Sequence, residues 1–165
     1  MTTLRELEAM EGSNSPFGVI PKGAYLLFIA DPIPQERKAV VDGKTGLERL
    51  SVPAVRVRYV VVSPGEKYDN RSFFQSHYFD PTNADALAFL KQAYQRVVGE
   101  PITGRDIADD QGNVDGEKMA QVWAAGMKGG RIAARVGIRK QRRQGVQTTE
   151  LENFVSGWAE SLEGV

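Results

Sequence analysis

The chain contains no cysteine and only one histidine, His77. The absence of cysteine excludes disulfide bonds, thiolate zinc sites and a cysteine nucleophile. A single imidazole argues against a histidine-rich metal site and against Ser-His-Asp chemistry. The longest apolar run, residues 24–30, is far shorter than the roughly 20 residues that cross a bilayer. We therefore expect no membrane segment.

We also expect no secretory leader at the start of the sequence. The first eight residues, MTTLRELE, have acids where a signal peptide needs bases and an apolar core. This pattern predicts a cytoplasmic protein.

Neither sign of charge is in excess, because 21 basic side chains balance 21 acidic ones. The charges are nevertheless segregated along the chain. Residues 119–149 carry seven bases and no acid, whereas residues 99–118 carry two bases and six acids. Residues 150–165 carry four acids and no base. A concentrated basic block predicts a local binding surface for an anionic partner, which the zero net charge conceals.

Short apolar or alternating segments predict five β-strands. The clearest is 52–62, where Val55, Val57 and Tyr59 lie on one face and Arg56 and Arg58 on the other. Prolines at 32 and 34 are expected to end the first strand. The predicted strands cover residues 24–30, 52–62, 72–79, 131–139 and 147–158.

Two helices are expected between the third and fourth strands. Apolar residues at helical spacing predict a helix over 84–98, which Gly99 ends. A shorter helix is predicted over 117–125, ended by Gly126. This order is that of a mainly β protein with helices, a five-stranded Greek-key OB barrel whose helix lies between strands three and four. A helical insertion at about 100–128 precedes strand four.

These boundaries predict three regions of the chain. Residues 1–19 are expected to be a flexible N-terminal tail, and residues 20–158 the OB-fold domain. Residues 159–165 form an acidic C-terminal end.

The basic residues have the pattern that single-stranded nucleic acid requires, namely cations for phosphates and aromatic rings for bases. On the predicted fourth strand, three arginines share one face and are separated by the small residues Ala133 and Gly137. Two loops add charge, one after the first strand and one at residues 140–143. The candidate nucleic-acid-binding residues are Arg37, Lys38, Arg56, Arg58, Phe73, His77, Arg131, Arg135, Arg139, Lys140, Arg142 and Arg143.

The aromatic residues of the third strand leave two readings open. Phe73 and His77 share their parity with Arg71 and Gln75, which favours an outward position where they would contact bases or phosphate. A place in the core is the alternative for both residues.

No motif predicts catalysis, a cofactor or a metal. The acidic run 109–116 has the composition of a calcium loop, but aligning Gly116 with the required glycine puts Val122 where a bidentate glutamate is needed. We interpret the run as a turn and expect no metal, no cofactor and no enzyme activity.

Three segments carry a resemblance to a known family: IPKGAY at 20–25, GRIAARV at 130–136, and Asn153-Phe154-Val155. Together they resemble the small OB-fold single-stranded DNA-binding proteins of phages and prophages, over roughly residues 20–158. The resemblance implies sequence-independent binding of single-stranded DNA in phage DNA replication or recombination, without a cofactor. It also implies the cytoplasm of a bacterial or phage-infected host, replication or recombination proteins as partners, and a homo-oligomer or cooperative assembly on DNA. The alternative is a protein-interaction module whose basic face docks an acidic partner from the same processes.

Overall fold

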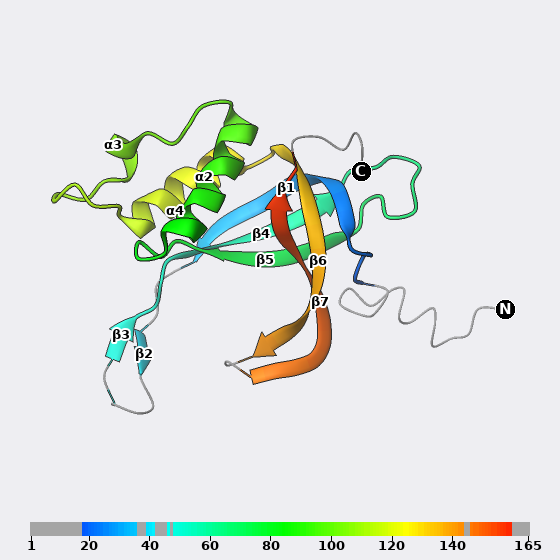
Figure 1. Ribbon diagram of the computed structural model, residues 1–165, viewed down its shortest axis with the longest axis horizontal. Helices are drawn as coiled ribbons and strands as arrows, with labels where there is room; N and C mark the ends of the chain where they lie inside the picture. Colours follow the sequence, from blue (N-terminus) through cyan, green and yellow to red (C-terminus); the bar gives the residue numbers. More distant parts are fainter. Residues whose placement is uncertain (1–17, 36–38, 42–45, 47, 144–145, 160–165) are drawn as a thin grey trace. The chain divides into compact units, whose positions relative to one another are not determined.

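The computed structural model describes residues 18–35, 39–41, 46, 48–143 and 146–159, and shows a mainly β protein with a few helices (Figure 1). The helices are α2 (Ala84–Val98), α3 (Gly104–Ile107) and α4 (Gly116–Met127). The strands are β1 (Gly23–Gln35), β2 (Ala39–Val41), β3 (Glu48–Leu50), β4 (Ala54–Val61), β5 (Ser72–Tyr78), β6 (Arg131–Arg143) and β7 (Val146–Trp158).

Five of the strands form one open antiparallel sheet in the order β5-β4-β1-β6-β7. The short strands β2 and β3 form a separate two-stranded ladder. All five predicted strands are therefore present, with α2, α3 and α4 between the third and fourth of them. The prediction of a mainly β fold with this element order is confirmed.

Period-2 alternation explains β4, as the sequence predicts. Val55, Val57, Tyr59 and Val61 are all 0% exposed, and Arg56 lies on the opposite, exposed side of the strand. β-Branched and aromatic residues suit such a half-buried pleated surface. The buried face of β4 thus forms part of the core, and the other face is outward.

The first strand is longer than predicted, because Pro32 and Pro34 do not end it. β1 continues to Gln35. Its register with β6 runs only from Gly23 to Phe28, so both prolines follow the last residue paired with β6. A proline without a ladder partner on that side loses no hydrogen bond. The β2–β3 ladder was not predicted either. It lies in the connection between β1 and β4, for which the sequence predicts no strand.

The chain divides into two compact units. The first unit comprises Met1–Ala30, Arg58–Gln75 and Arg131–Val165, and the second comprises Asp31–Val57 and Ser76–Gly130. Strands β1, β4 and β5 each contribute residues to both units, whereas β6 and β7 belong to the first and the helices to the second.

Trp123 of α4 organises the core of the second unit. Its ring lies 5.5 Å from that of His77 and 5.6 Å from that of Phe79, centroid to centroid. Its Nε1–H donates a hydrogen bond of 2.9 Å to the carbonyl of Leu90 in α2. The Trp123 side chain is fully buried, and this bond gives its one polar atom a hydrogen-bond partner.

The ends of α2 are as predicted, but those of α4 are not. The Asn83 side chain caps α2 by accepting from the Ala86 N–H, and Gly99 ends the helix with φ 88°. In α4, Asp115 is the N-cap and Gly126 lies inside the helix rather than ending it. A side chain at position 126 would meet the ring of Tyr94, so the glycine allows a close approach of α2 and α4.

The strands β6 and β7 form a long antiparallel hairpin in the first unit. The prediction that residues 140–143 belong to a basic loop is wrong, because β6 extends to Arg143 and the pairing continues to Arg143 opposite Val146. Opposite Ile138 in this ladder, the buried Asn153 side chain accepts from the N–H of Ile20 at 2.8 Å and donates to its carbonyl at 2.9 Å.

One further bond joins β5 to β7, the two edge strands of the sheet. The Gln75 side-chain oxygen accepts a hydrogen bond of 2.7 Å from the Val155 backbone N–H.

Within the described ranges, no helix is both long and apolar enough to span a membrane.

Candidate functional site

The arginines of β6 lie on one exposed face of the first unit. Arg131, Arg135 and Arg139 are exposed, whereas Ile132 and the alternate residues up to position 136 are buried. Successive arginines are four residues apart, or about 13 Å at the rise of a β-strand. The predicted arginine face of this strand is therefore confirmed, and we call these three residues the arginine row.

The third member of the row has partners on β7. Arg139 pairs with Glu152 in the ladder, and its Nε lies 2.9 Å from Glu152 Oε1. Its Cζ lies 4.7 Å from the centroid of the Phe154 ring, within the range of a cation–π contact. Phe154 in turn pairs with Gly137 and lies over it, since a Cβ atom there would be 2.8 Å from Phe154 Cε1. We call Gly137, Arg139, Glu152 and Phe154 the Arg139 cluster.

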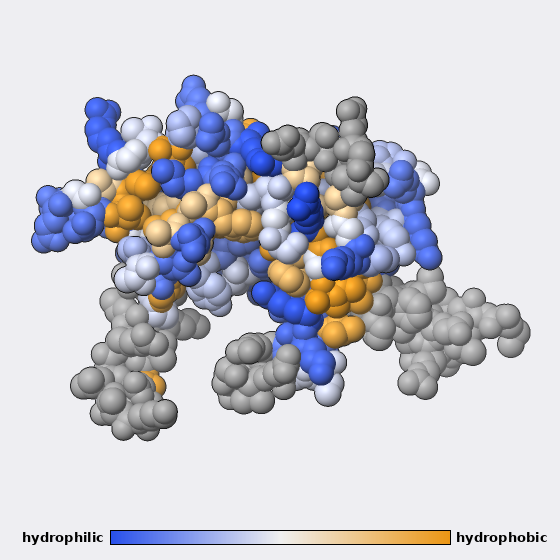
Figure 2. Space-filling model, in the orientation of Figure 1, coloured by the Kyte–Doolittle hydropathy of each residue, from blue (hydrophilic) through white to orange (hydrophobic). Residues whose placement is uncertain are grey.

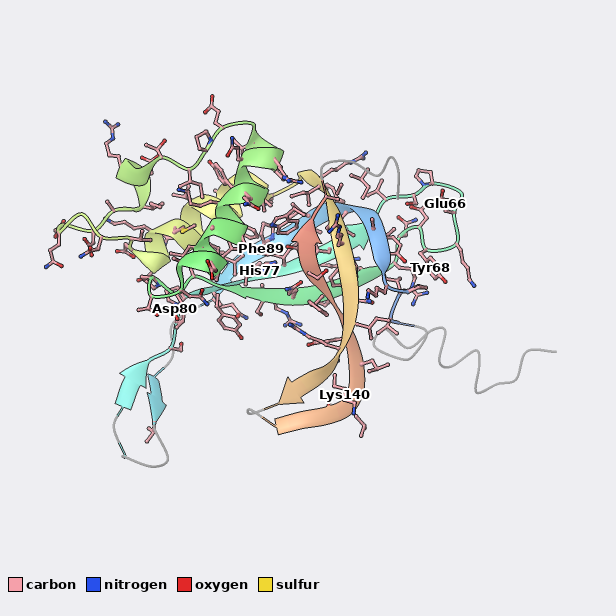
Figure 3. All side chains as sticks on the ribbon, viewed as in Figure 1. Glu66, Tyr68, His77, Asp80, Phe89 and Lys140 are labelled. Carbon is pink, nitrogen blue, oxygen red and sulfur yellow. The ribbon has the colours of Figure 1, made fainter. Side chains whose placement is uncertain are left out.

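The hairpin also carries a lysine beyond the arginine row. Lys140 is exposed and lies on the distal part of the hairpin (Figure 3). Figure 2 shows hydrophilic and apolar surface side by side in this part of the molecule. Positive charge thus continues past the arginine row, although on the other face of the strand.

The aromatic positions of β5 are the reverse of those expected. His77 is only 5% exposed, so the expectation that it faces outward is wrong. Its ring packs between those of Phe89, at 6.3 Å, and Trp123, at 5.5 Å. Phe73 is half-buried, with its ring 5.4 Å from that of Tyr59. Both residues therefore belong to the core side of the sheet.

The outward residues of β5 are Phe74 and Tyr78, which are 50% and 61% exposed. Neither was among the predicted site residues. In the first unit, Phe74 lies on the same side of the sheet as Arg58 of β4, because each is adjacent in its strand to a member of the inward-facing Tyr59–Phe73 pair. The outward face of this unit thus combines a half-exposed aromatic ring with arginines.

The remaining predicted residues are placed as follows. Arg56 is exposed and belongs to the second unit, whereas Arg58 belongs to the first. Arg142 and Arg143 lie in β6, but their side chains are outside the described part of the structure. Arg37 and Lys38 lie entirely outside the described residues.

Comparison of the chain with protein-family models, with curated proteins and with solved structures found no match.

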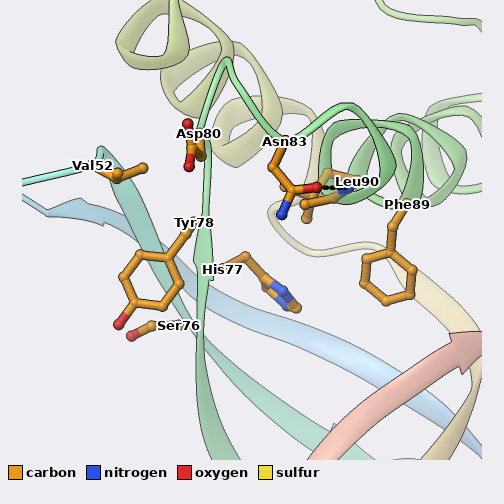
Figure 4. A pocket seen from close by; sticks show the side chains of 9 residues that line it. Val52, Ser76, His77, Tyr78, Asp80, Asn83, Phe89 and Leu90 are labelled. Carbon is orange, nitrogen blue, oxygen red and sulfur yellow. Dashed lines mark hydrogen bonds between the residues drawn. The ribbon is translucent and has the colours of Figure 1, made fainter. Parts of the chain in front are cut away.

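The second unit contains a pocket of about 500 Å³ where β5 meets the start of α2 (Figure 4). His77 and Tyr78 leave the strand on opposite sides and both line it, together with Phe89. Two polar groups of the lining are already engaged. Asp80 accepts from the N–H and hydroxyl of Thr82, which lowers the pKa of its carboxyl, and Asn83 caps α2.

Three residues of the candidate interface were not predicted, and only Phe74 had a signal in the sequence. Phe74 has the parity opposite to Phe73, so a reversed choice of faces would have found it. Phe154 and Glu152 lie in the strand with the weakest pattern, and only the hairpin register brings them to Arg139. No periodicity within β7 predicts that pairing.

Proposed function

We propose that the protein binds single-stranded DNA, without sequence preference, through the outward face of its first unit. The observation that carries this proposal is the exposed arginine row on one face of β6. Cationic side chains contact phosphates whatever the base, and this electrostatic contribution dominates non-specific binding. Ala133 adds little side-chain bulk between the first two arginines, whereas the Phe154 ring of β7 covers Gly137 between the second and the third.

An aromatic platform accompanies the cations. Phe74 exposes half of its side chain on the same side of the sheet as Arg58. Unpaired bases stack on such rings irrespective of their identity, at about 1–3 kcal/mol per base. Together the two groups supply both of the interactions that single strands require.

The fold we propose for this activity is an OB barrel. The strand order β5-β4-β1-β6-β7 becomes a five-stranded barrel if its edges β5 and β7 meet, and the bond between Gln75 and Val155 joins those edges. OB barrels bind oligonucleotides on the face of their second and third strands, which correspond to β4 and β5. The outward Arg58 and Phe74 lie on those strands.

The biological setting follows from the resemblance to phage and prophage proteins. We infer a role in phage DNA replication or recombination, in the bacterial or phage-infected cytoplasm. The protein would coat exposed strands, alone or as a cooperative assembly, with replication or recombination proteins as partners. It would act as a binding protein, with no enzymatic step and no cofactor.

A polarisation titration with labelled oligo-dT of about 25 nucleotides tests the proposal. Three cations of the first unit lie on this outward face and would contact phosphates, namely Arg58, Arg131 and Arg135. At about 0.7 per contact, log K should fall with log salt at a slope of about −2. Unlabelled duplex of the same length should compete poorly. Absence of binding at 20 mM salt, or equal binding to duplex, contradicts the proposal.

The second candidate is a protein-interaction module, and one observation favours it. On the face of the hairpin opposite the arginine row, the exposed Ile138 and Leu151 accompany Lys140, which pairs with Leu151. A surface of apolar side chains beside a lysine favours binding of an acidic protein over binding of a nucleic acid. Under this alternative, Ile138→Ser with Leu151→Ser would leave DNA binding unchanged and abolish binding of a replication or recombination partner.

A further inference from the structure

The three arginines of the row do not have equivalent surroundings. In the ladder, Arg131 faces Phe28, and Arg135 faces Ala24 on one side and Gly157 on the other. Arg139 alone of the three faces an acid, Glu152, with 2.9 Å between Nε and Oε1. The charge of Arg139 is therefore already offset, whereas the ladder neighbours of the other two are uncharged.

The same contacts fix the position of the Arg139 guanidinium. Glu152 holds Nε from one side, and the Phe154 ring lies beneath Cζ at 4.7 Å. Phe154 is itself seated on Gly137, where any side chain would displace the ring. Half of the Arg139 side chain, 49%, nonetheless remains exposed.

We propose that Arg139 stacks on a base of the bound strand, while Arg131 and Arg135 contact phosphates. This inference rests on the proposed function and assigns a distinct role within it. A guanidinium is planar and stacks on bases, and one whose charge is already offset gains little from a phosphate. Phe154 and Glu152 act as positioning residues, because they hold the plane without touching the DNA.

Substitution by lysine separates the two roles, since lysine keeps the charge and removes the plane. Affinity should be measured for oligo-dT and for an abasic strand with the same number of phosphates. For Arg139→Lys we expect about a tenfold loss on oligo-dT, from about 1.4 kcal/mol of stacking, and a change below about twofold on the abasic strand. Arg135→Lys is the matched control and should change both affinities equally and slightly.

Alanine variants give a second readout. Arg135→Ala should reduce the salt slope by about 0.7, the value of one phosphate contact, whereas Arg139→Ala should leave the slope unchanged. Thermal unfolding of each variant establishes that it is folded.

Three outcomes overturn the inference. They are equal losses for Arg139→Lys on both strands, a loss no larger than that of Arg135→Lys, and a slope change of about 0.7 for Arg139→Ala. If the unsubstituted protein fails to bind oligo-dT at low salt, the proposed function fails and this role fails with it.

Discussion

Gln75 and Val155 connect the two edge strands of the five-stranded sheet through a hydrogen bond of 2.7 Å. The acceptor is the Gln75 side chain, so this contact differs from the backbone ladder that joins neighbouring strands. A side chain spans a wider separation between two strands than a backbone–backbone pair does. The bond is the contact on which our proposal of a barrel depends.

Removing this bond should destabilise the protein. We expect Gln75→Ala to lower the free energy of unfolding by about 1–3 kcal/mol, because it leaves the part-buried Val155 N–H without an acceptor. Urea unfolding measures the change. Gln92→Ala, at an exposed position of α2, is the control and should alter stability by less than about 0.5 kcal/mol. Equal effects of the two substitutions would show that the bond contributes nothing.

A pair of glycines at helix starts provides a second test. Gly116 and Gly104 each begin a helix, and alanine is the better helix former by about 1 kcal/mol. A Cβ at position 116 would collide with the carbonyl of Phe79, whereas none of the described atoms lies within 4 Å of one at 104. We expect Gly116→Ala to destabilise by about 1–3 kcal/mol. Gly104→Ala should be neutral or stabilising by up to about 1 kcal/mol. Thermal melts that place both variants on the same side of the parent protein would contradict this.

Tyr59 should make stability depend on alkaline pH. Burial raises the pKa of its hydroxyl well above the ordinary value of 10.0, so the folded state keeps the proton that the unfolded state releases. The stabilisation is complete below pH 10 and is lost as the pH rises further, at up to about 1.4 kcal/mol per pH unit. Urea unfolding between pH 8 and 11 should show this slope. Tyr59→Phe should be measurably flatter, and an identical slope in that variant would exclude Tyr59 as the cause.

Local patterns predicted more of the fold than of the site. The alternation around Val57 and the Gly99 terminus depend on neighbouring residues, and both were predicted correctly. The inward face of β5 was predicted wrongly, because aromatic residues occupy both alternating faces of that strand. Only the packing of Trp123 against His77 decides which parity is inward. The Arg139 cluster depends on the hairpin register, which no single strand encodes.

The corrected parity of β5 makes a prediction about stacking. Phe74→Ala should weaken binding to oligo-dT about tenfold, since a half-exposed ring that stacks on one base is lost. Its stability should change by less than about 1 kcal/mol. Phe73→Ala removes the ring that packs on Tyr59, and should destabilise by about 2 kcal/mol with little effect on the affinity of the folded protein. Calorimetry measures the change in stability, and polarisation on the same samples measures the change in affinity. A loss of affinity for Phe73→Ala together with a loss of stability for Phe74→Ala would restore Phe73 as the outward residue.

Glu152 should limit the phosphate binding of the hairpin. If its carboxylate offsets Arg139, Glu152→Gln releases that cation, and the salt slope on an abasic strand should steepen by about 0.7. Glu66→Gln is the charge-matched control, because it removes an equal charge from an exposed position of the first unit outside the hairpin. Both variants reduce the general repulsion of phosphates, so each should bind somewhat more tightly at low salt. Only Glu152→Gln adds a contact, so only this variant should change the slope. A slope that steepens equally in both would mean that the pair with Arg139 does not hold the guanidinium away from phosphate.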